Sequence, residues 1–141
     1  MSDISERIFS VIEDPVLMSL ATVTPDGKPW VRYVMGVGGH DLTIRFTTFL
    51  GSRKVMHIKS NPEVHIACGV TSPEKAERYL QIQGRGEVST DPTEKNEMWK
   101  DYLQAYFSGP DDPDYCVVIV KPYRIEYVTM TGSSPDVWEA P

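Results

Sequence analysis

The chain has 141 residues, 40% of them hydrophobic and 24% charged, which is the composition of one soluble globular domain spanning residues 1–141. The formal net charge of −6 argues against nucleic acid as a partner. No apolar run resembles a signal peptide or approaches the ~20 residues of a membrane span, so we expect a cytoplasmic protein with no membrane partner.

The first half of the chain is predicted to alternate short helices with strands. Apolar spacing from Asp3 to Glu13 predicts an amphipathic helix, so residues 1–14 form an N-terminal helical segment. A second short helix is predicted over 52–60, where Asn61-Pro62 ends it. Apolar runs bounded by turn residues predict strands at 18–24, 30–37, 42–48, 64–70 and 79–89.

The second half is predicted to hold one more helix and one long strand. The helix spans 93–106, and four side chains are spaced for one face: Met98, Trp99, Tyr102 and Tyr106. The strand, or pair of strands, spans 115–128 with a bend at Lys121-Pro122, and residues 132–141 form an irregular tail. Strands joined by hairpin-length links, with few helices, predict a mainly β domain, a closed or nearly closed antiparallel barrel.

The charges are unevenly distributed along the chain. Between Lys28 and Lys59 there are six basic residues and one acidic residue, Asp41, so this segment carries +5 and the remainder carries −11. A local positive field in an acidic protein suits a small anionic ligand better than a polyanion. A chance run of solvated lysines and arginines is the alternative.

The most informative segment joins the third predicted strand to the second predicted helix. Thr47 and Thr48 end the strand, a glycine turn follows, and Ser52 stands where a helix N-cap belongs. Arg53 and Lys54 then occupy the first helical turn, where cations are disfavoured because the helix N-terminus already carries partial positive charge. A bound phosphate dianion would resolve this conflict, since backbone N–H groups, the hydroxyl and both cations could converge on it. The alternative is that both cations are solvated.

Arg32 is the second feature that points to an anion. It lies in the middle of a predicted strand and shares a face with Trp30 and Val34. A charge among apolar neighbours needs a partner, and the next strand leads to the turn before Arg53, so we expect Arg32 to reach the same anion. A salt bridge to an acidic side chain, or a solvated position on an edge strand, is the alternative.

These segments resemble the pyridoxamine 5'-phosphate oxidase-like FMN-binding split β-barrel family over roughly residues 15–128. The segment from Phe46 to Lys54 is similar to the family's flavin-phosphate turn, in which an aromatic residue and a threonine precede Ser-Arg-Lys. Arg32-Tyr33-Val34-Met35 is similar to the family's first flavin strand. The helix and loop from Met98 to Asp114 look like the general-stress-protein branch.

The resemblance implies an antiparallel Greek-key split barrel that binds FMN through two strands and the phosphate turn. The implied contacts are Arg32, Tyr33, Val34, Met35, Thr47, Thr48, Ser52, Arg53 and Lys54. It also implies a homodimer with two shared flavin sites, in which Tyr79 and the strand after it face the partner's flavin. A small barrel filled by side chains has no deep pocket for a flavin ring, which independently favours a second copy.

The resemblance implies a flavin-dependent oxidoreductase with a small-molecule redox substrate, in which the flavin supplies the redox chemistry. No side chain stands out as a catalytic acid or base. Oxidation of pyridoxamine phosphate itself is not expected. Val37 stands where the vitamin B6 oxidases carry a lysine, and the tail has neither Arg nor His. The alternatives are a flavin-binding stress protein without turnover and a deazaflavin- or haem-binding relative.

Other chemistry has little support in the sequence. His40, His57 and His65 lack metal-ligand spacing and are predicted as a turn, a helix-surface and a strand residue, respectively, so no metal site is predicted. Cys68 and Cys116 lie in apolar runs, which predicts buried reduced thiols.

Overall fold

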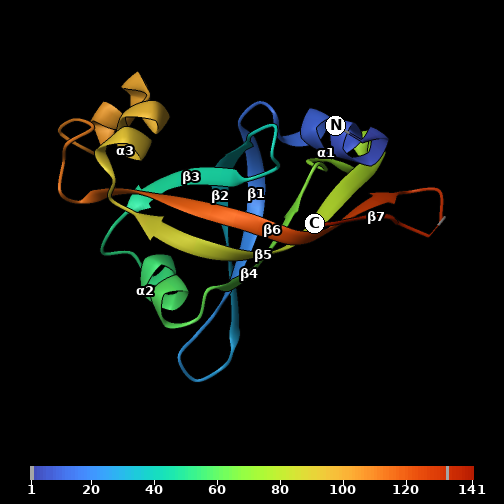
Figure 1. The fold of residues 1–141 in the computed structure, drawn as a ribbon, viewed down its shortest axis with the longest axis horizontal. Helices are drawn as coiled ribbons and strands as arrows, with labels where there is room; N and C mark the ends of the chain where they lie inside the picture. Colours follow the sequence, from blue (N-terminus) through green and yellow to red (C-terminus); the bar gives the residue numbers. More distant parts are fainter. Residues whose placement is uncertain (1, 133) are drawn as a thin grey trace.

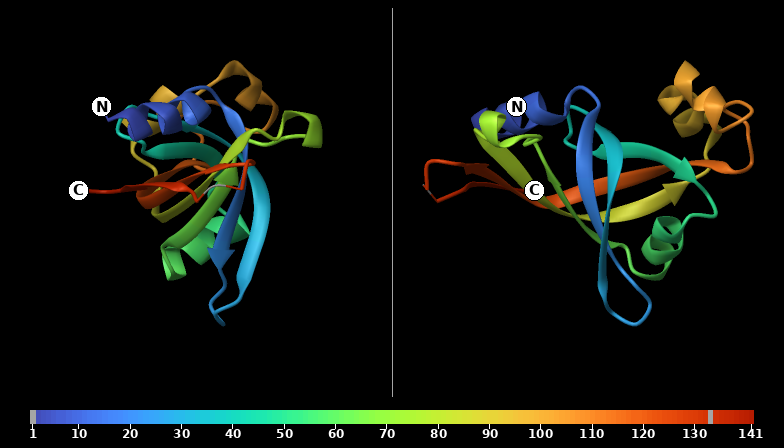
Figure 2. Two further views of the ribbon diagram at one scale, coloured as in Figure 1. Left: turned by 90° about the vertical axis from the view of Figure 1, so that its right-hand side faces the viewer. Right: turned by 180° about the vertical axis from the view of Figure 1, so that it is seen from behind.

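The computed structural model describes residues 2–132 and 134–141, in which six antiparallel strands close into a barrel (Figure 1; Figure 2). Their bounds are β1 Val16–Val23, β2 Pro29–Gly38, β3 Ile44–Phe49, β4 Glu63–Cys68, β5 Arg78–Ser89 and β6 Tyr115–Thr129. The pairing order is β3-β2-β1-β4-β5-β6, and β3 also pairs with β6, which closes the barrel. The predicted mainly β barrel is confirmed, and each predicted strand end lies within two residues of the observed one.

Short helices cover parts of this barrel. They are α1 (Asp3–Ile12) against β2, α2 (Arg53–Ser60) against β1 and β5, and α3 (Pro92–Met98) against β3 and β6. The predicted N-terminal helix is confirmed, although Met1 lies outside the described residues. A Cβ at Gly38 would collide with the side chain of Ile12, so the close approach of α1 to β2 requires glycine there. Within the described residues, no helix has the length and apolar character needed to cross a membrane.

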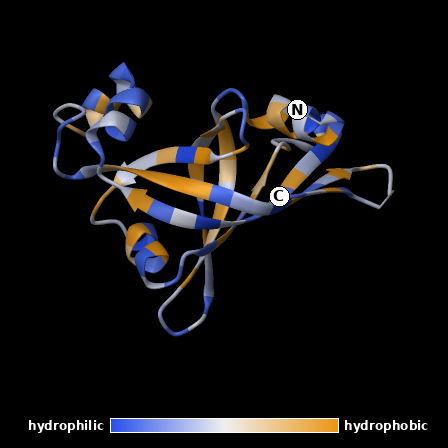
Figure 3. Ribbon diagram, in the orientation of Figure 1, coloured by the Kyte–Doolittle hydropathy of each residue, from blue (hydrophilic) through white to orange (hydrophobic). Residues whose placement is uncertain are grey.

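Alternate strand residues fill the interior of the barrel, as the period of a strand requires. The fully buried strand side chains include Met18, Leu20, Ile44, Phe46, Ile66, Leu80, Ile82 and Ile125. The first part of β6 is hydrophobic and buried, whereas its second part is mixed (Figure 3). Cys68 and Cys116 are buried free thiols, as predicted, and burial raises the pKa of Cys68 to about 12.

One seam of the barrel is open. β1 pairs with β2 along the whole strand from Val16 to Val23, whereas β2 and β3 pair only at Val37–Gly38 with Ile44–Arg45. From that point β3 follows β6 while β2 follows β1, and the two strands diverge (Figure 1). Arg32 lies on β2. The divergence leaves room for the end of β3 and the start of α2 to lie near Arg32.

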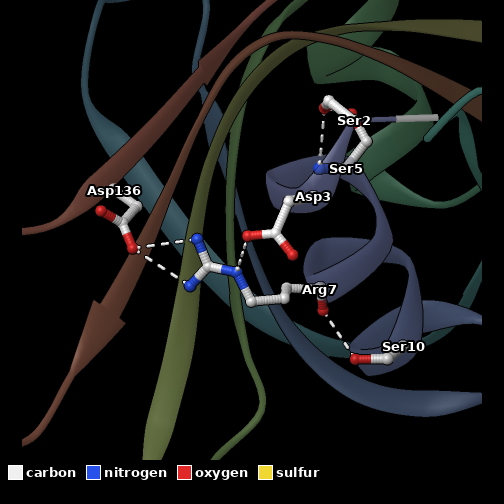
Figure 4. Close-up of polar contacts among 6 residues, drawn as sticks. All are labelled: Ser2, Asp3, Ser5, Arg7, Ser10 and Asp136. Atoms are coloured by element: carbon white, nitrogen blue, oxygen red, sulfur yellow. Dashed lines mark hydrogen bonds and ion pairs between the residues drawn. The ribbon is translucent and has the colours of Figure 1, made fainter.

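The predicted irregular tail over 132–141 is wrong, because residues Asp136–Glu139 form a short strand, β7, that pairs with the end of β6. Arg7 on α1 donates two hydrogen bonds of 3.1 Å to Asp136 and lies 3.4 Å from Asp3 (Figure 4). The sequence of the tail has no strand periodicity. Its order comes instead from the long-range pairing with β6 and from this ion pair. Ser133, which also falls in the predicted tail, lies outside the described residues.

The predicted single helix over 93–106 is also wrong. The α-helix ends at Met98, Trp99 has extended backbone angles, and a 3-10 helix over Asp101–Ala105 follows. Trp99 packs edge-on against Tyr115 with ring centroids 5.5 Å apart. Met98 and Trp99 are partly buried against Leu103 and Phe107, whereas Tyr102 and Tyr106 are exposed, so the four side chains of the predicted face do not share one buried side.

Candidate functional site

The start of α2 breaks two rules of helix design. Ser52 is the N-cap by its backbone angles, yet its side chain makes no capping hydrogen bond. Its Oγ is buried and has no hydrogen-bond partner among the described residues. The first turn holds no acidic residue and begins with Arg53 and Lys54, although the positive end of the helix dipole favours acids. A buried hydroxyl and two cations thus gather where an anion is stabilised.

Lys54 extends this cluster toward the end of β3. Its Nζ donates a 2.9 Å hydrogen bond to the Oγ1 of Thr48, a buried residue. Burial lowers the pKa of Lys54, and the nearby charge of Arg32 lowers it further. The ammonium is therefore partly desolvated and repelled by its neighbour, which an added anion would relieve.

Arg32 faces the cluster from β2. Its Nη1 donates to the Oγ1 of Thr22 at 2.6 Å and to the carbonyl of Trp30 at 3.1 Å. Burial lowers the pKa of Arg32, and so does the charge of Arg53, whose guanidinium carbon lies 5.5 Å from the centre of the Trp30 ring. The salt bridge considered for Arg32 is absent among the described residues, because its contacts there are with neutral groups.

The three cations together lack a counter-ion. Over residues 2–132 and 134–141, no carboxylate lies within ion-pair distance of Arg32, Arg53 or Lys54. Four other arginines do pair with carboxylates, namely Arg7, Arg45, Arg85 and Arg124, and Arg45 lies 2.8 Å from Glu94. We call the three cations Arg32, Arg53 and Lys54, together with the neutral hydroxyl of Ser52, the cation cluster.

His57 belongs to this site, and the sequence prediction that it lies on the helix surface is wrong. Its side chain is 4% exposed, and its Nδ1 lies 2.9 Å from the Oγ1 of Thr22 and 3.4 Å from the Nη2 of Arg32. Burial lowers the pKa of His57, and the charges of Arg32 and Arg53 lower it further. The spacing of four residues between Arg53 and His57, which places both on one side of α2, was the signal available in the sequence.

A trough leads away from the cation cluster through the opening between β2 and β3. Its first part has a volume of about 310 Å³ and is lined by Lys54, Thr48, Thr47 and Met35. Its second part, of about 710 Å³, shares Met35 and Thr47 and continues to Val37. Tyr102 borders both parts. The trough thus joins an end that carries the ammonium of Lys54 to a larger, mostly apolar end that Glu13, Glu97 and Lys100 also line.

The structure separates the predicted contact residues into three groups. Thr48 and Lys54 line the smaller part of the trough, Met35 and Thr47 line both parts, and Arg32, Ser52 and Arg53 lie beside Lys54 without lining the trough. Val34 is buried in the barrel core, so its side chain does not face the trough. Tyr33 and Tyr79 line a separate depression of about 170 Å³ on the outside of the barrel, beside Leu17 and Ser19.

The chain is similar in sequence and in fold to known proteins. The sequence matches the family described as pyridoxamine 5'-phosphate oxidase over residues 4–129. General stress protein 26 of Bacillus subtilis (strain 168) is 30% identical over 134 residues, covering 94% of each chain. The crystal structure of General Stress Protein 26 from Bacillus anthracis str. Sterne has a TM-score of 0.84 at 25% identity, covering 99% of this chain and 100% of that one. A solved F420 reductase has a TM-score of 0.63 at 30% identity, covering 82% and 93%.

The fold and the open seam define the class of the protein as a split β-barrel. The chain belongs to the pyridoxamine 5'-phosphate oxidase family. Among its relatives it is similar over nearly its whole length to two general stress proteins, so the family and branch predicted from the sequence are confirmed.

Proposed function

We propose that this chain binds FMN, with the flavin phosphate on the cation cluster and the flavin ring in the trough, and that it acts as a flavin-dependent oxidoreductase. The observation that carries the proposal is the proximity of Arg32, Arg53 and Lys54, beside the buried Oγ of Ser52. Among the described residues, the three cations have no carboxylate in ion-pair distance and the Oγ has no hydrogen-bond partner. An unpaired buried polar group costs about 1–3 kcal/mol, so its retention indicates a ligand.

The charged end of the trough suits a phosphate dianion in particular. The first N–H groups of α2 have no intrahelical partner, and the Ser52 hydroxyl and three cations add further donors. A guanidinium such as that of Arg53 can bind two oxygens at once, whereas the ammonium of Lys54 acts as a point charge. The residues present therefore fit the phosphate of FMN.

The apolar end of the trough suits a flat ring. Ligand sites have volumes of about 300–1,000 Å³ and are mostly apolar, and the two parts of the trough fall within that range. A bound flavin supplies the redox chemistry, while Met35, Thr47 and Tyr102 would orient it and exclude water. We assign no catalytic acid or base.

The outer apolar face of the barrel, formed by Leu17, Val31, Tyr33 and Met35, supports a homodimer. Leu17 pairs with Met35 across β1 and β2, and all four side chains lie on one side of these strands and are 45–71% exposed. Such a patch on one face marks an interaction site. Met35 also lines the trough, so a second copy on this face would cover the flavin and bring its own Tyr79 region close.

Sedimentation velocity at low micromolar concentration tests the dimer. We expect a dimer that FMN stabilises, because a ligand bound between two chains favours their association. Val31→Asp, which places a charge on the outer apolar face, should yield monomers. A monomer that binds FMN tightly at one per chain would contradict the shared site.

The phosphate part of the proposal is tested by comparing FMN with riboflavin, which lacks the phosphate. Charge-assisted contacts contribute roughly 1.5–3 kcal/mol each, so the loss of two or three should weaken binding by at least two orders of magnitude. Quenching of flavin fluorescence measures both dissociation constants. Equal affinities would refute the phosphate site.

The identity of the cofactor and the occurrence of turnover need separate measurements. Similarity to an F420 reductase supports a deazaflavin as the second candidate, so the absorption spectrum of the purified protein and identification of the released cofactor decide between the two. Bleaching of the flavin by NAD(P)H would support an oxidoreductase, and its absence would favour a binding protein without turnover. We expect no pyridoxal phosphate from pyridoxamine phosphate, since Val37 and the tail lack the groups noted above.

A further inference from the structure

His57 occupies a position that the proposed function does not yet explain. It lies on α2, the helix that carries Arg53 and Lys54, but its side chain points inward and is 4% exposed. There it meets Thr22 from β1 and Arg32 from β2. A buried imidazole that contacts one member of the cation cluster can control where that member lies.

The hydrogen bonds determine the protonation of the ring. A guanidinium can only donate, so the contact of 3.4 Å from Arg32 Nη2 requires Nδ1 to accept. The Oγ1 of Thr22 accepts from Arg32 Nη1 at 2.6 Å, and its own proton has two acceptors in reach, Nδ1 at 2.9 Å and the carbonyl of Trp30 at 3.5 Å. The contact from Arg32 needs an Nδ1 without a proton, and the shorter Thr22 contact is compatible with it, which places the single proton of the neutral ring on Nε2.

The surrounding charges favour the same neutral form. The charged groups that act on His57 are the guanidinium of Arg32 on β2 and that of Arg53 on α2, and β1 contributes the neutral hydroxyl of Thr22. A proton on Nδ1 would add a third positive charge and remove the acceptor that Arg32 uses. The ring is therefore held as a neutral acceptor.

We propose that His57 is a positioning residue for the phosphate site, in which its neutral Nδ1, together with Thr22, fixes the guanidinium of Arg32 toward the anion. A carboxylate would hold Arg32 as firmly, but it would also cancel the charge that attracts the phosphate. A neutral acceptor orders a flexible arginine before binding and leaves its charge available, which reduces the entropy lost when the ligand binds. This inference rests on the proposed binding of FMN.

Two substitutions of His57 separate its acceptor from its bulk. His57→Asn keeps an acceptor, the amide oxygen, near the place of Nδ1, whereas His57→Leu keeps a buried apolar side chain without one. At pH 8, we expect His57→Leu to weaken FMN binding about tenfold and to change riboflavin binding less than about twofold. His57→Asn should retain FMN affinity within about threefold of the wild type. Fluorescence quenching gives all of these values.

Thr22→Val, which preserves shape and removes the hydroxyl, is the second route to the same result if His57→Leu does not fold. It should also weaken FMN more than riboflavin. Equal weakening of both ligands, or no weakening in either variant, would overturn the positioning role. Equal affinity of the wild type for FMN and riboflavin would instead overturn the phosphate site itself, so the two failures are distinguishable.

Discussion

The N-termini of α2 and α3 follow strands of the same barrel, yet they are built in opposite ways. At α3 the carboxylate of Asp91 accepts a 3.2 Å hydrogen bond from the backbone of Thr93, and Glu94 adds an acid to the first turn. At α2 the cap hydroxyl of Ser52 makes no such bond, and the first turn carries two cations. The start of α3 is capped and carries its own acid, whereas the first turn of α2 holds no acidic residue.

The two helix starts also differ in how the protein affects the charge of a nearby cation. Hydrogen bonds to Glu94 raise the pKa of Arg45 and thus stabilise its charge. Burial and the charge of Arg32 lower the pKa of Lys54, which means that its charge is destabilised in the protein alone. The chain completes the start of α3 with its own acids, so the exception at α2 supports the proposed phosphate site.

The largest expected effect is on flavin binding when Arg32 is removed. Arg32→Ala should weaken FMN binding by about tenfold to a hundredfold, because a charge-assisted contact contributes roughly 1.5–3 kcal/mol. The control is Arg85→Ala, which removes an exposed arginine paired with Glu63 and should leave the affinity unchanged. Fluorescence quenching measures both, and a thermal melt of the apoprotein should show that Arg32→Ala affects binding more than folding. The reverse order would indicate a structural role.

The second prediction concerns the stability of the apoprotein and compares Arg45→Met with Lys54→Met. Arg45→Met should lower the free energy of unfolding by about 1–3 kcal/mol, because it leaves the partly buried Glu94 without its bidentate partner. Lys54→Met should have little effect or raise it, since it removes a repelled cation and keeps the apolar stem. Urea denaturation measures the free energy of unfolding of both variants. Equal decreases would contradict the proposed difference between the two helix starts.

A smaller effect separates the two capping residues. Asp91→Ala should lower the free energy of unfolding by about 1 kcal/mol, as the loss of an N-cap bond does. Ser52→Ala should change it by less than about 0.5 kcal/mol, because no capping bond is lost, yet it should weaken FMN binding about fivefold. Denaturation of the apoprotein and fluorescence quenching give the two values. A destabilised Ser52→Ala apoprotein with unchanged FMN affinity would show that Ser52 serves only the helix.

The smallest expected effect is the pH dependence that His57 contributes. Its pKa is lowered in the folded protein, so its contribution to stability is complete above the ordinary value of 6.5 and is lost as the pH falls below it. Between pH 7 and pH 5 the free energy of unfolding of the apoprotein should therefore fall more for the wild type than for His57→Asn. Urea denaturation at both pH values measures the difference, and identical changes would show that His57 is not held neutral.

Much of the fold could be predicted from the sequence because its signals are local. Strand periodicity, Gly and Pro turns and the apolar face of α1 depend on neighbours within a few residues, and these elements were placed correctly. β7 could not be predicted, because its order comes from pairing with β6 and from the contact of Arg7 with Asp136. The helix break at Trp99 was also missed, and there the Trp99 ring packs on Tyr115, a residue distant in the sequence.

The sequence by itself determined the conflict at the start of α2, since a cap serine followed by two cations is visible within three residues, and it determined that Arg32 needs a partner. Only the tertiary structure decided that these groups meet without a carboxylate, because that depends on which strands diverge and where α2 packs. The same packing buried His57 and sent Tyr33 and Tyr79 to the outer surface. Local rules show which charged side chains need a partner. Long-range strand pairing decides which groups lie close enough to be that partner.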